Sequence, residues 1–206
     1  MRLIESDQTR MIDLPGVGPC PRPVDIDQRL TGFVTLKSLR IYRFQPGPPI
    51  HGESEADEVF ILPLSGSMQI EISGRDRFHG PISAEGEDCA LYMAPHHGYL
   101  LAPTDNLVVA YARAEAMGRV AVQAVSGNES LGLAEHLGFR RVALPTGGRL
   151  EVGGAETLVH VIAGGLDCAD GSVGAGQTMA LAAHEVLGLV AVGDSDLLIV
   201  SVSVSV

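Results

Sequence analysis

One histidine and several carboxylates stand close together between residues 47 and 66. His51 and Glu53 are separated by one residue, and Glu58 follows five residues later. Imidazole and carboxylate groups bind divalent metals such as Fe, Mn, Ni or Zn, and a carboxylate can also act as a general base. A β-barrel could direct all three side chains at one interior point. We therefore take these residues as the candidate site, with a solvated rim at the barrel mouth as the alternative interpretation.

Strand alternation gives a separate argument for Glu58. Residues 58 to 65 form an apolar run that ends at Gly66, and Glu58 shares one face of this predicted strand with Phe60, Leu62 and Leu64. Because these neighbours are apolar, we expect Glu58 to point into the barrel. A carboxylate in that position must be paired, metal-bound or protonated.

Composition limits the class of protein. The 206 residues are 46% hydrophobic and carry a net charge of −11, which predicts a real core and argues against nucleic-acid or anionic-membrane partners. Three scattered cysteines without a CxxC pair argue against disulfides and favour a reducing compartment. The N-terminus lacks an apolar signal region, and no apolar run approaches the ~20 residues of a membrane span. We expect a soluble cytoplasmic protein.

The candidate residues must be positioned by strands. Residues 1–28 are rich in proline and glycine and predict an irregular arm that wraps the domain or pairs with another subunit. Alternating apolar and polar residues predict strands at 32–36, 39–44, 68–72, 89–93, 99–101 and 107–111. The chain ends in a strictly alternating Val/Ser strand, which must be paired inside a barrel or across a homodimer. Residues 129–137 are the one helical candidate.

The second half of the chain repeats the first. The segment from Glu58 to Gly66 is matched by the segment from Glu156 to Gly164, 98 residues later. At this offset Arg149 takes the place of His51, and we expect Arg149 to form an internal salt bridge with Glu156. Preserved order at this spacing indicates duplication of a small domain. We predict an arm at 1–28, a first domain at 29–113 with the site, and a degenerate second domain at 114–206.

These motifs resemble the cupin superfamily. In the first cupin motif, His51-x-Glu53, four residues and Glu58 match the usual order, with Glu53 where a second histidine usually stands and Gly66 one residue late. Gly86, Pro95, Gly98 and Asn106 keep the skeleton of the second motif, but Leu100 or Leu101 occupies its histidine position. The chain looks like a bicupin, and two short segments, ILPLSGSMQIEISG and ALYMAPHHGY, are similar to the 5-deoxyglucuronate isomerase branch.

The resemblance implies an all-β fold of two double-stranded β-helix (jelly-roll) barrels in tandem. It also implies a divalent metal held by His51, Glu53, Glu58 and His97, with His96 as the alternate to His97. Glu53 and Glu58 would then be the catalytic carboxylates of a metal-dependent isomerase or oxygenase acting on a sugar, sugar acid or other small carboxylate. The alternative is a cupin that binds a ligand or serves in assembly, without metal or catalysis.

Overall fold

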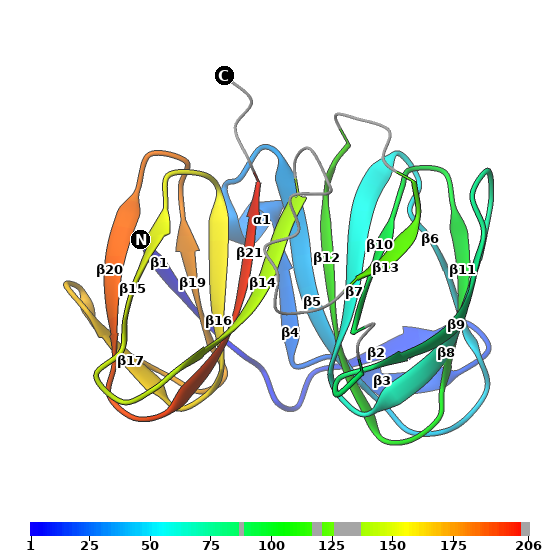
Figure 1. Cartoon of the computed structure of the whole chain (residues 1–206), viewed down its shortest axis with the longest axis horizontal. Helices are drawn as coiled ribbons and strands as arrows, with labels where there is room; N and C mark the ends of the chain where they lie inside the picture. The colour runs from blue at the N-terminus through cyan, green and yellow to red at the C-terminus, as the bar shows by residue number, and fades with distance from the viewer. Residues whose placement is uncertain (87–88, 117–120, 126–136, 203–206) are drawn as a thin grey trace.

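The computed structural model is almost entirely β-structure, as the alternation predicts (Figure 1). It describes residues 1–86, 89–116, 121–125 and 137–202. In these ranges the one helix is the short α1 (Gln28–Thr31), capped by the Asp27 side chain at its start. The described residues contain no helix long and apolar enough to cross a membrane. The helical candidate at 129–137 lies outside the described residues except for Leu137, which begins a strand.

Two sheets enclose the first apolar core. The six-stranded sheet has the order β13 (Gln123–Val125), β10 (Ala90–Met93), β7 (Asp57–Ser65), β12 (Leu107–Glu115), β5 (Leu36–Phe44) and β4 (Val24–Asp27). The four-stranded sheet has the order β6 (Ile50–Glu53), β11 (Gly98–Pro103), β8 (Ser67–Ser73) and β9 (Phe78–Ser83). Apolar side chains from both sheets form one buried cluster, so we call this pair the first sandwich. β9 lies in a segment that the polar sequence favours as a loop.

The second sandwich repeats this arrangement. Its five-stranded sheet has the order β1 (Arg2–Glu5), β19 (Gln177–Leu181), β16 (Thr157–Ala163), β21 (Ser195–Val202) and β14 (Leu137–Leu144). Its four-stranded sheet has the order β15 (Arg149–Gly153), β20 (Val186–Ala191), β17 (Gly165–Cys168) and β18 (Gly171–Gly174). The Val/Ser strand β21 is a central strand, which satisfies its predicted need for pairing.

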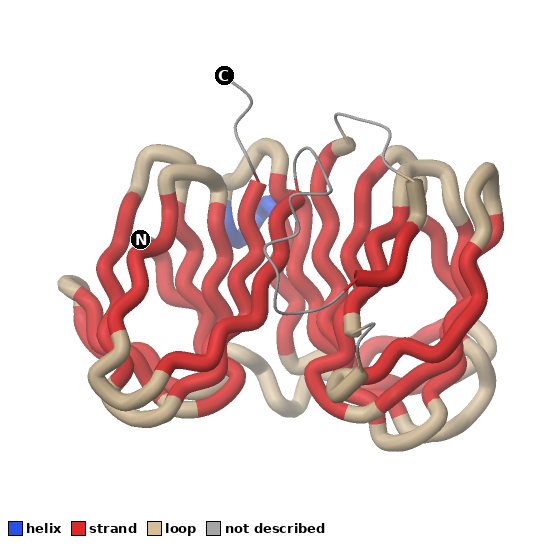
Figure 2. Tube along the Cα trace, in the orientation of Figure 1, coloured by secondary structure: helices blue, strands red, loops and turns tan. Residues whose placement is uncertain are grey.

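The two sandwiches lie side by side, with the six-stranded and five-stranded sheets facing each other in the middle (Figures 1 and 2). A third apolar cluster fills the space between these two sheets and contains side chains from both. Both faces of β7 are therefore buried: Val59 and Ile61 lie inside the first sandwich, whereas Phe60 and Leu62 pack against the second. This double burial decides where Glu58 points.

The N-terminal segment is more regular than the sequence predicts. Residues 1–28 contain β1, the hairpin of β2 (Met11–Leu14) and β3 (Gly18–Pro21), and β4. β1 and β4 are edge strands of two different sheets, so this segment spans both sandwiches. Pro19 and Pro21 are tolerated because β3 belongs to a two-stranded ribbon, where a missing N–H can face away from the partner strand.

Two equivalent glycines show that the repeat extends to backbone detail. Gly66 follows β7 with φ +79°, and Gly164 follows β16 with φ +80°. A Cβ atom on Gly66 would lie 2.4 Å from the carbonyl oxygen of Asn106, and one on Gly164 would lie 2.5 Å from that of Asp194. Both positions therefore require glycine, because the backbone is left-handed there and a carbonyl oxygen occupies the place of a Cβ atom.

Candidate functional site

His51 and Glu53 lie on β6 and point away from the core of the first sandwich. Ile50 precedes them on this strand and is buried in that core, with 6% of its surface exposed. Since successive side chains of a strand alternate between faces, His51 and Glu53 lie on the other face, and both are exposed. Gly52 faces inward, where a Cβ atom would lie 2.3 Å from the Tyr99 ring.

These two residues border a groove of about 530 Å³ along the four-stranded sheet. Strand pairing places Leu100 between His51 and Glu71, and Gly98 between Glu53 and Ser73. The groove is lined by these six residues together with Leu14, Pro15, Ile50, Gly52 and Tyr99. It combines two carboxylates, one imidazole and one hydroxyl with the apolar surface of Leu100 and Tyr99. Glu71 and Ser73 were missed from the sequence because only the pairing of β8 with β11 brings them to β6.

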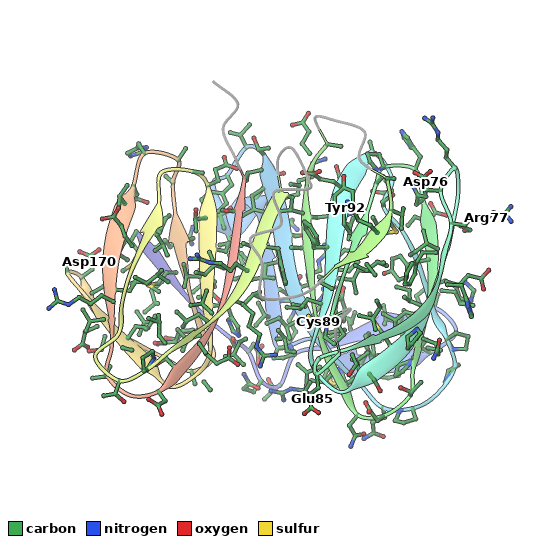
Figure 3. The ribbon with its side chains drawn as sticks, viewed as in Figure 1. Asp76, Arg77, Glu85, Cys89, Tyr92 and Asp170 are labelled. Atoms are coloured by element: carbon green, nitrogen blue, oxygen red, sulfur yellow. The ribbon has the colours of Figure 1, made fainter. Side chains whose placement is uncertain are left out.

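Glu58 was predicted to point into the barrel, and this prediction is wrong: its side chain faces the second sandwich. Its Oε1 accepts a hydrogen bond from the Leu137 N–H at 2.6 Å, and its Oε2 accepts one from the Tyr92 hydroxyl at 3.1 Å. Tyr92 lies on the neighbouring β10 (Figure 3), and Leu137 begins β14 of the second sandwich. The apolar neighbours Phe60 and Leu62 face the second sandwich, so the strand-face argument led to the wrong side of the sheet.

His97 and His96 have different surroundings. His97 is 4% exposed, and its Nδ1 lies 3.2 Å from the Ala94 carbonyl oxygen and 2.9 Å from that of Pro95, so Nδ1 carries the proton. Its Nε2 accepts a hydrogen bond from the Asp76 N–H at 3.1 Å, which leaves no lone pair for a metal. His96 is exposed with φ 61°, and its N–H donates to the Glu55 carbonyl oxygen at 2.6 Å.

An arginine occupies the polar end of the first sandwich. Arg113 follows Tyr111 on the inward face of β12, and its Nη2 donates to the Glu53 carbonyl oxygen at 2.7 Å. Its Nη1 lies 3.2 Å from a Glu55 carboxylate oxygen, and its Nε lies 3.5 Å from an Asp57 carboxylate oxygen. Asp57 also pairs with Lys37. The Arg113 guanidinium and the Lys37 ammonium thus provide the positive charges among these carboxylates.

The predicted metal ligands do not converge. Within the part of the chain that the structure describes, no three His, Cys, Asp or Glu side chains form a group that could hold a metal ion. His51 and Glu53 face the groove, Glu58 faces the second sandwich, and His97 is bonded to backbone groups. The four residues together do not fit a metal, and metal binding by His51 and Glu53 alone stays a prediction.

One tyrosine of the groove, the half-buried Tyr99, lies next to the buried Tyr111. The rings of Tyr99 and Tyr111 are 6.0 Å apart, and burial raises the pKa of Tyr111 to about 12. Burial also raises the pKa of Tyr99 well above its ordinary value, with a further contribution from Tyr111. Both phenols are therefore protonated at neutral pH and can donate hydrogen bonds. Tyr42 stacks on Phe44, with ring centroids 5.4 Å apart.

The second copy repeats the role of Glu58. Glu156 does not pair with Arg149 as predicted; its carboxylate accepts hydrogen bonds from the N–H groups of Val34, Thr35 and Leu36, at 2.5 to 2.9 Å. Each carboxylate therefore accepts backbone hydrogen bonds from the start of the other sandwich's first long strand: Glu58 from one N–H and Glu156 from three. His160 is buried beside Thr178, with Nδ1 2.9 Å from the hydroxyl, and burial lowers its pKa to about 4.

Comparisons with known proteins identify the fold. A scan against protein-family models and a search for curated relatives return no match. Among solved structures, the bacterial pirin YhhW from Escherichia coli with nickel(II) is similar at a TM-score of 0.74 and 12% identity, covering 97% of each chain. Quercetin 2,3-dioxygenase from Acinetobacter baumannii gives 0.72 and 12%, covering 98% of this chain and 86% of that one. The Lactobacillus farciminis oxalate decarboxylase formate complex gives 0.70 and 8%, covering 97% and 85%.

These neighbours are cupin-fold proteins, and each alignment covers both sandwiches of this chain. The chain therefore has the cupin fold that its motifs resemble. At 8–12% identity the similarity shows the fold, and the chemistry must be argued from the residues of this chain.

Proposed function

We propose that this protein is a bicupin that binds a small, neutral, hydroxylated molecule, such as a sugar, in the groove beside His51 and Glu53. The first domain, 29–113, supplies the groove, and the second domain, 114–206, is a degenerate copy that supports it. The segment 1–28 joins the two. In this proposal the protein binds its ligand without a metal, and the cytoplasm and a homodimer remain predictions.

The observation that carries the proposal is the outward direction of His51 and Glu53 onto the groove. Glu53 and Glu71 accept hydrogen bonds, His51 and Ser73 can donate or accept, and Leu100 offers an apolar surface. Ligand sites commonly combine such apolar walls with a few polar groups. Two carboxylates disfavour an anionic ligand, so a neutral sugar fits better than a sugar acid or another small carboxylate.

The second candidate is a metal-dependent isomerase or oxygenase, with the 5-deoxyglucuronate isomerase branch as the specific resemblance. The spacing His51-x-Glu53 favours it, as does the fold shared with a nickel-bound pirin and a dioxygenase. In that case His51 would be the metal ligand and Glu53 a further ligand or the general base. Glu58 and His97 argue against this candidate, because both side chains already bond to other groups of the protein.

Elemental analysis together with sugar binding separates the two candidates. The purified protein is measured by mass spectrometry for Fe, Mn, Ni and Zn, before and after incubation with each metal and desalting. A panel of neutral monosaccharides is then tested by saturation-transfer NMR. We expect a metal content near zero, binding of at least one sugar, and affinity reduced about tenfold or more in His51→Ala and Glu53→Gln, through lost hydrogen bonds.

The matched control is His184→Ala, which removes an exposed histidine of the second sandwich. It should leave sugar binding unchanged. About one metal per chain that is lost in His51→Ala would overturn the proposal in favour of the metal-dependent enzyme. Absence of binding across the sugar panel, or equal weakening by the control, would also contradict it.

A further inference from the structure

A second group of charged side chains lies on the first sandwich, away from the groove. Four arginines and two aspartates line a cavity of about 370 Å³ against β4 and β5, together with Leu30: Arg10, Arg22, Arg29, Arg40, Asp25 and Asp27. None of these residues belongs to the candidate site described above. The sequence spreads them over residues 10–40, so no local motif reveals the cluster.

The fold of the N-terminal segment assembles this cluster. Pairing of β4 with β5 places Asp25 directly opposite Arg40. The Arg22 N–H donates to the Arg10 carbonyl oxygen at 3.0 Å, which joins the two ends of the β2–β3 hairpin. Both arginines are thereby carried to the same side of Asp25.

Three guanidinium groups share the single carboxylate of Asp25. Arg22 Nη2 lies 2.8 Å from its Oδ2, Arg40 Nε lies 3.4 Å from its Oδ1, and Arg10 Nη2 also pairs with Oδ2. Arg29 pairs separately with Asp27 at 3.0 Å. Four positive and two negative groups leave a local excess of two positive charges, in a chain whose net charge is −11. Such a local reversal of sign favours an anion at this position.

The network also has more donors than acceptors. Among the described residues, the buried Nε of Arg22 has no hydrogen-bond partner, and the buried Nε of Arg40 has only its ion pair with Asp25 at 3.4 Å, which is not a hydrogen bond. Buried polar atoms nearly always have a partner, and an exception can indicate an ion that binds there. The Arg22 guanidinium is held in place over the Tyr42 ring, 5.7 Å from its centroid. Arg10 and Arg29 are 45% and 92% exposed, so they stand on the open side of the cavity.

We propose that this cavity binds the phosphate group of a small phosphorylated molecule. A phosphate monoester carries close to two negative charges, which matches the local excess, and planar guanidinium groups bind phosphate oxygens with paired hydrogen bonds. The volume exceeds that of phosphate alone and leaves room for the attached organic group. The inference is independent of sugar binding in the groove, because the two sites share no residue.

Calorimetric titration at about 0.1 M salt, where the Debye length is about 10 Å, tests this proposal with three probes: inorganic phosphate, glucose 6-phosphate and glucose. We expect both phosphates to bind and to raise the melting temperature. The affinity for glucose, which lacks a phosphate group, should be the same in wild type and in Arg10→Gln. Arg10→Gln should weaken glucose 6-phosphate about tenfold, the loss expected for one charge-assisted contact. Arg29→Gln, at a still more exposed position, is the second variant in case Arg10→Gln does not fold.

Arg43→Gln is the matched control. Arg43 is exposed on the same β5 strand, bonds to Gln8 and does not line the cavity, while its loss changes the net charge equally. It should alter phosphate affinity less than about twofold, as a distant surface charge does at moderate ionic strength. Equal weakening by Arg43→Gln and Arg10→Gln, or absence of phosphate binding at millimolar concentration, would overturn the proposal.

Discussion

The two sandwiches share the contacts that join them and differ at the ends of their barrels. Glu58 and Glu156 occupy equivalent positions 98 residues apart, and each accepts from backbone of the other sandwich, Glu58 one N–H and Glu156 three. At the barrel end of the first sandwich, Arg113 opposes Val59. In the second sandwich Ser201 opposes Thr157, the residue equivalent to Val59, and so takes the place of Arg113.

The carboxylates around Arg113 are also missing from the second copy. At the same offset, Asp57 corresponds to Ala155 and Glu55 to Gly153. A small pocket of about 190 Å³, lined in part by Ser201 and Gly153, remains where the first sandwich has an ion-pair network. The paired glutamates therefore belong to the architecture common to both copies, whereas the charged barrel end and the adjoining groove are special to the first. Specific function is therefore expected in the first sandwich.

Removal of Glu58 should have the largest effect on stability. Glu58→Ala leaves the buried Leu137 N–H and Tyr92 hydroxyl without this acceptor, so we expect the free energy of unfolding to fall by about 3–4 kcal/mol. Glu156→Ala is the matched variant; its half-buried carboxylate should account for less, about 1–2 kcal/mol. Urea denaturation measures both. A larger loss for Glu156→Ala would contradict the central role of Glu58.

His160 should make the second sandwich sensitive to acid. The native state holds this side chain neutral with a pKa of about 4, whereas the unfolded chain protonates it near the ordinary value of 6.5. Its contribution to stability is therefore complete above about pH 6.5 and declines as the pH falls to about 4, by about 3 kcal/mol in total. His160→Leu introduces the residue of the equivalent position, Leu62, and should remove this part of the pH dependence.

Urea denaturation of both forms between pH 7 and 4 provides the measurement. The difference between wild type and His160→Leu should grow steadily in favour of the variant as the pH falls. A constant difference across this range would show that protonation of His160 does not contribute.

Exchange of the barrel-end residue tests the difference between the copies. Arg113→Ser gives the first sandwich the side chain of the second and removes one cation from Asp57, while Lys37 remains. We expect a loss of about 2 kcal/mol in the free energy of unfolding, because a largely buried carboxylate loses part of its compensation. Ser201→Ala should change it by less than about 0.5 kcal/mol. Similar losses for both would mean that the network has no special role.

The fold could be predicted well from the sequence because its signals are local. Alternating residues predict most strands, and the 98-residue repeat predicts a second copy of the same strand and its terminal glycine. The short strands β1 to β4 and β9 were not foreseen, because proline-rich or polar edge segments carry little alternation. Their pairing depends on neighbouring strands from distant parts of the chain.

The site could be predicted only in part. The sequence proposes His51 and Glu53 as site residues but does not tell which face of β6 they occupy, since a shift of one residue exchanges the two faces. It found the Arg at position 149 but paired it with Glu156, which instead binds the first sandwich. The Arg113 network and the Arg10–Arg40 cluster require contacts between strands far apart in sequence, so no spacing rule could reveal them.

The sequence by itself therefore determined the β-class and the residue types available for chemistry, and it predicted a second copy of the strand from Glu58 to Gly66. The tertiary structure decided what those residues do, and Glu58 shows why. Its neighbours on β7 are apolar on both faces, and alternation distinguishes two faces only when one of them is exposed. Because a second sandwich covers the outer face, only the packing of the two copies shows that Glu58 joins them instead of entering the barrel.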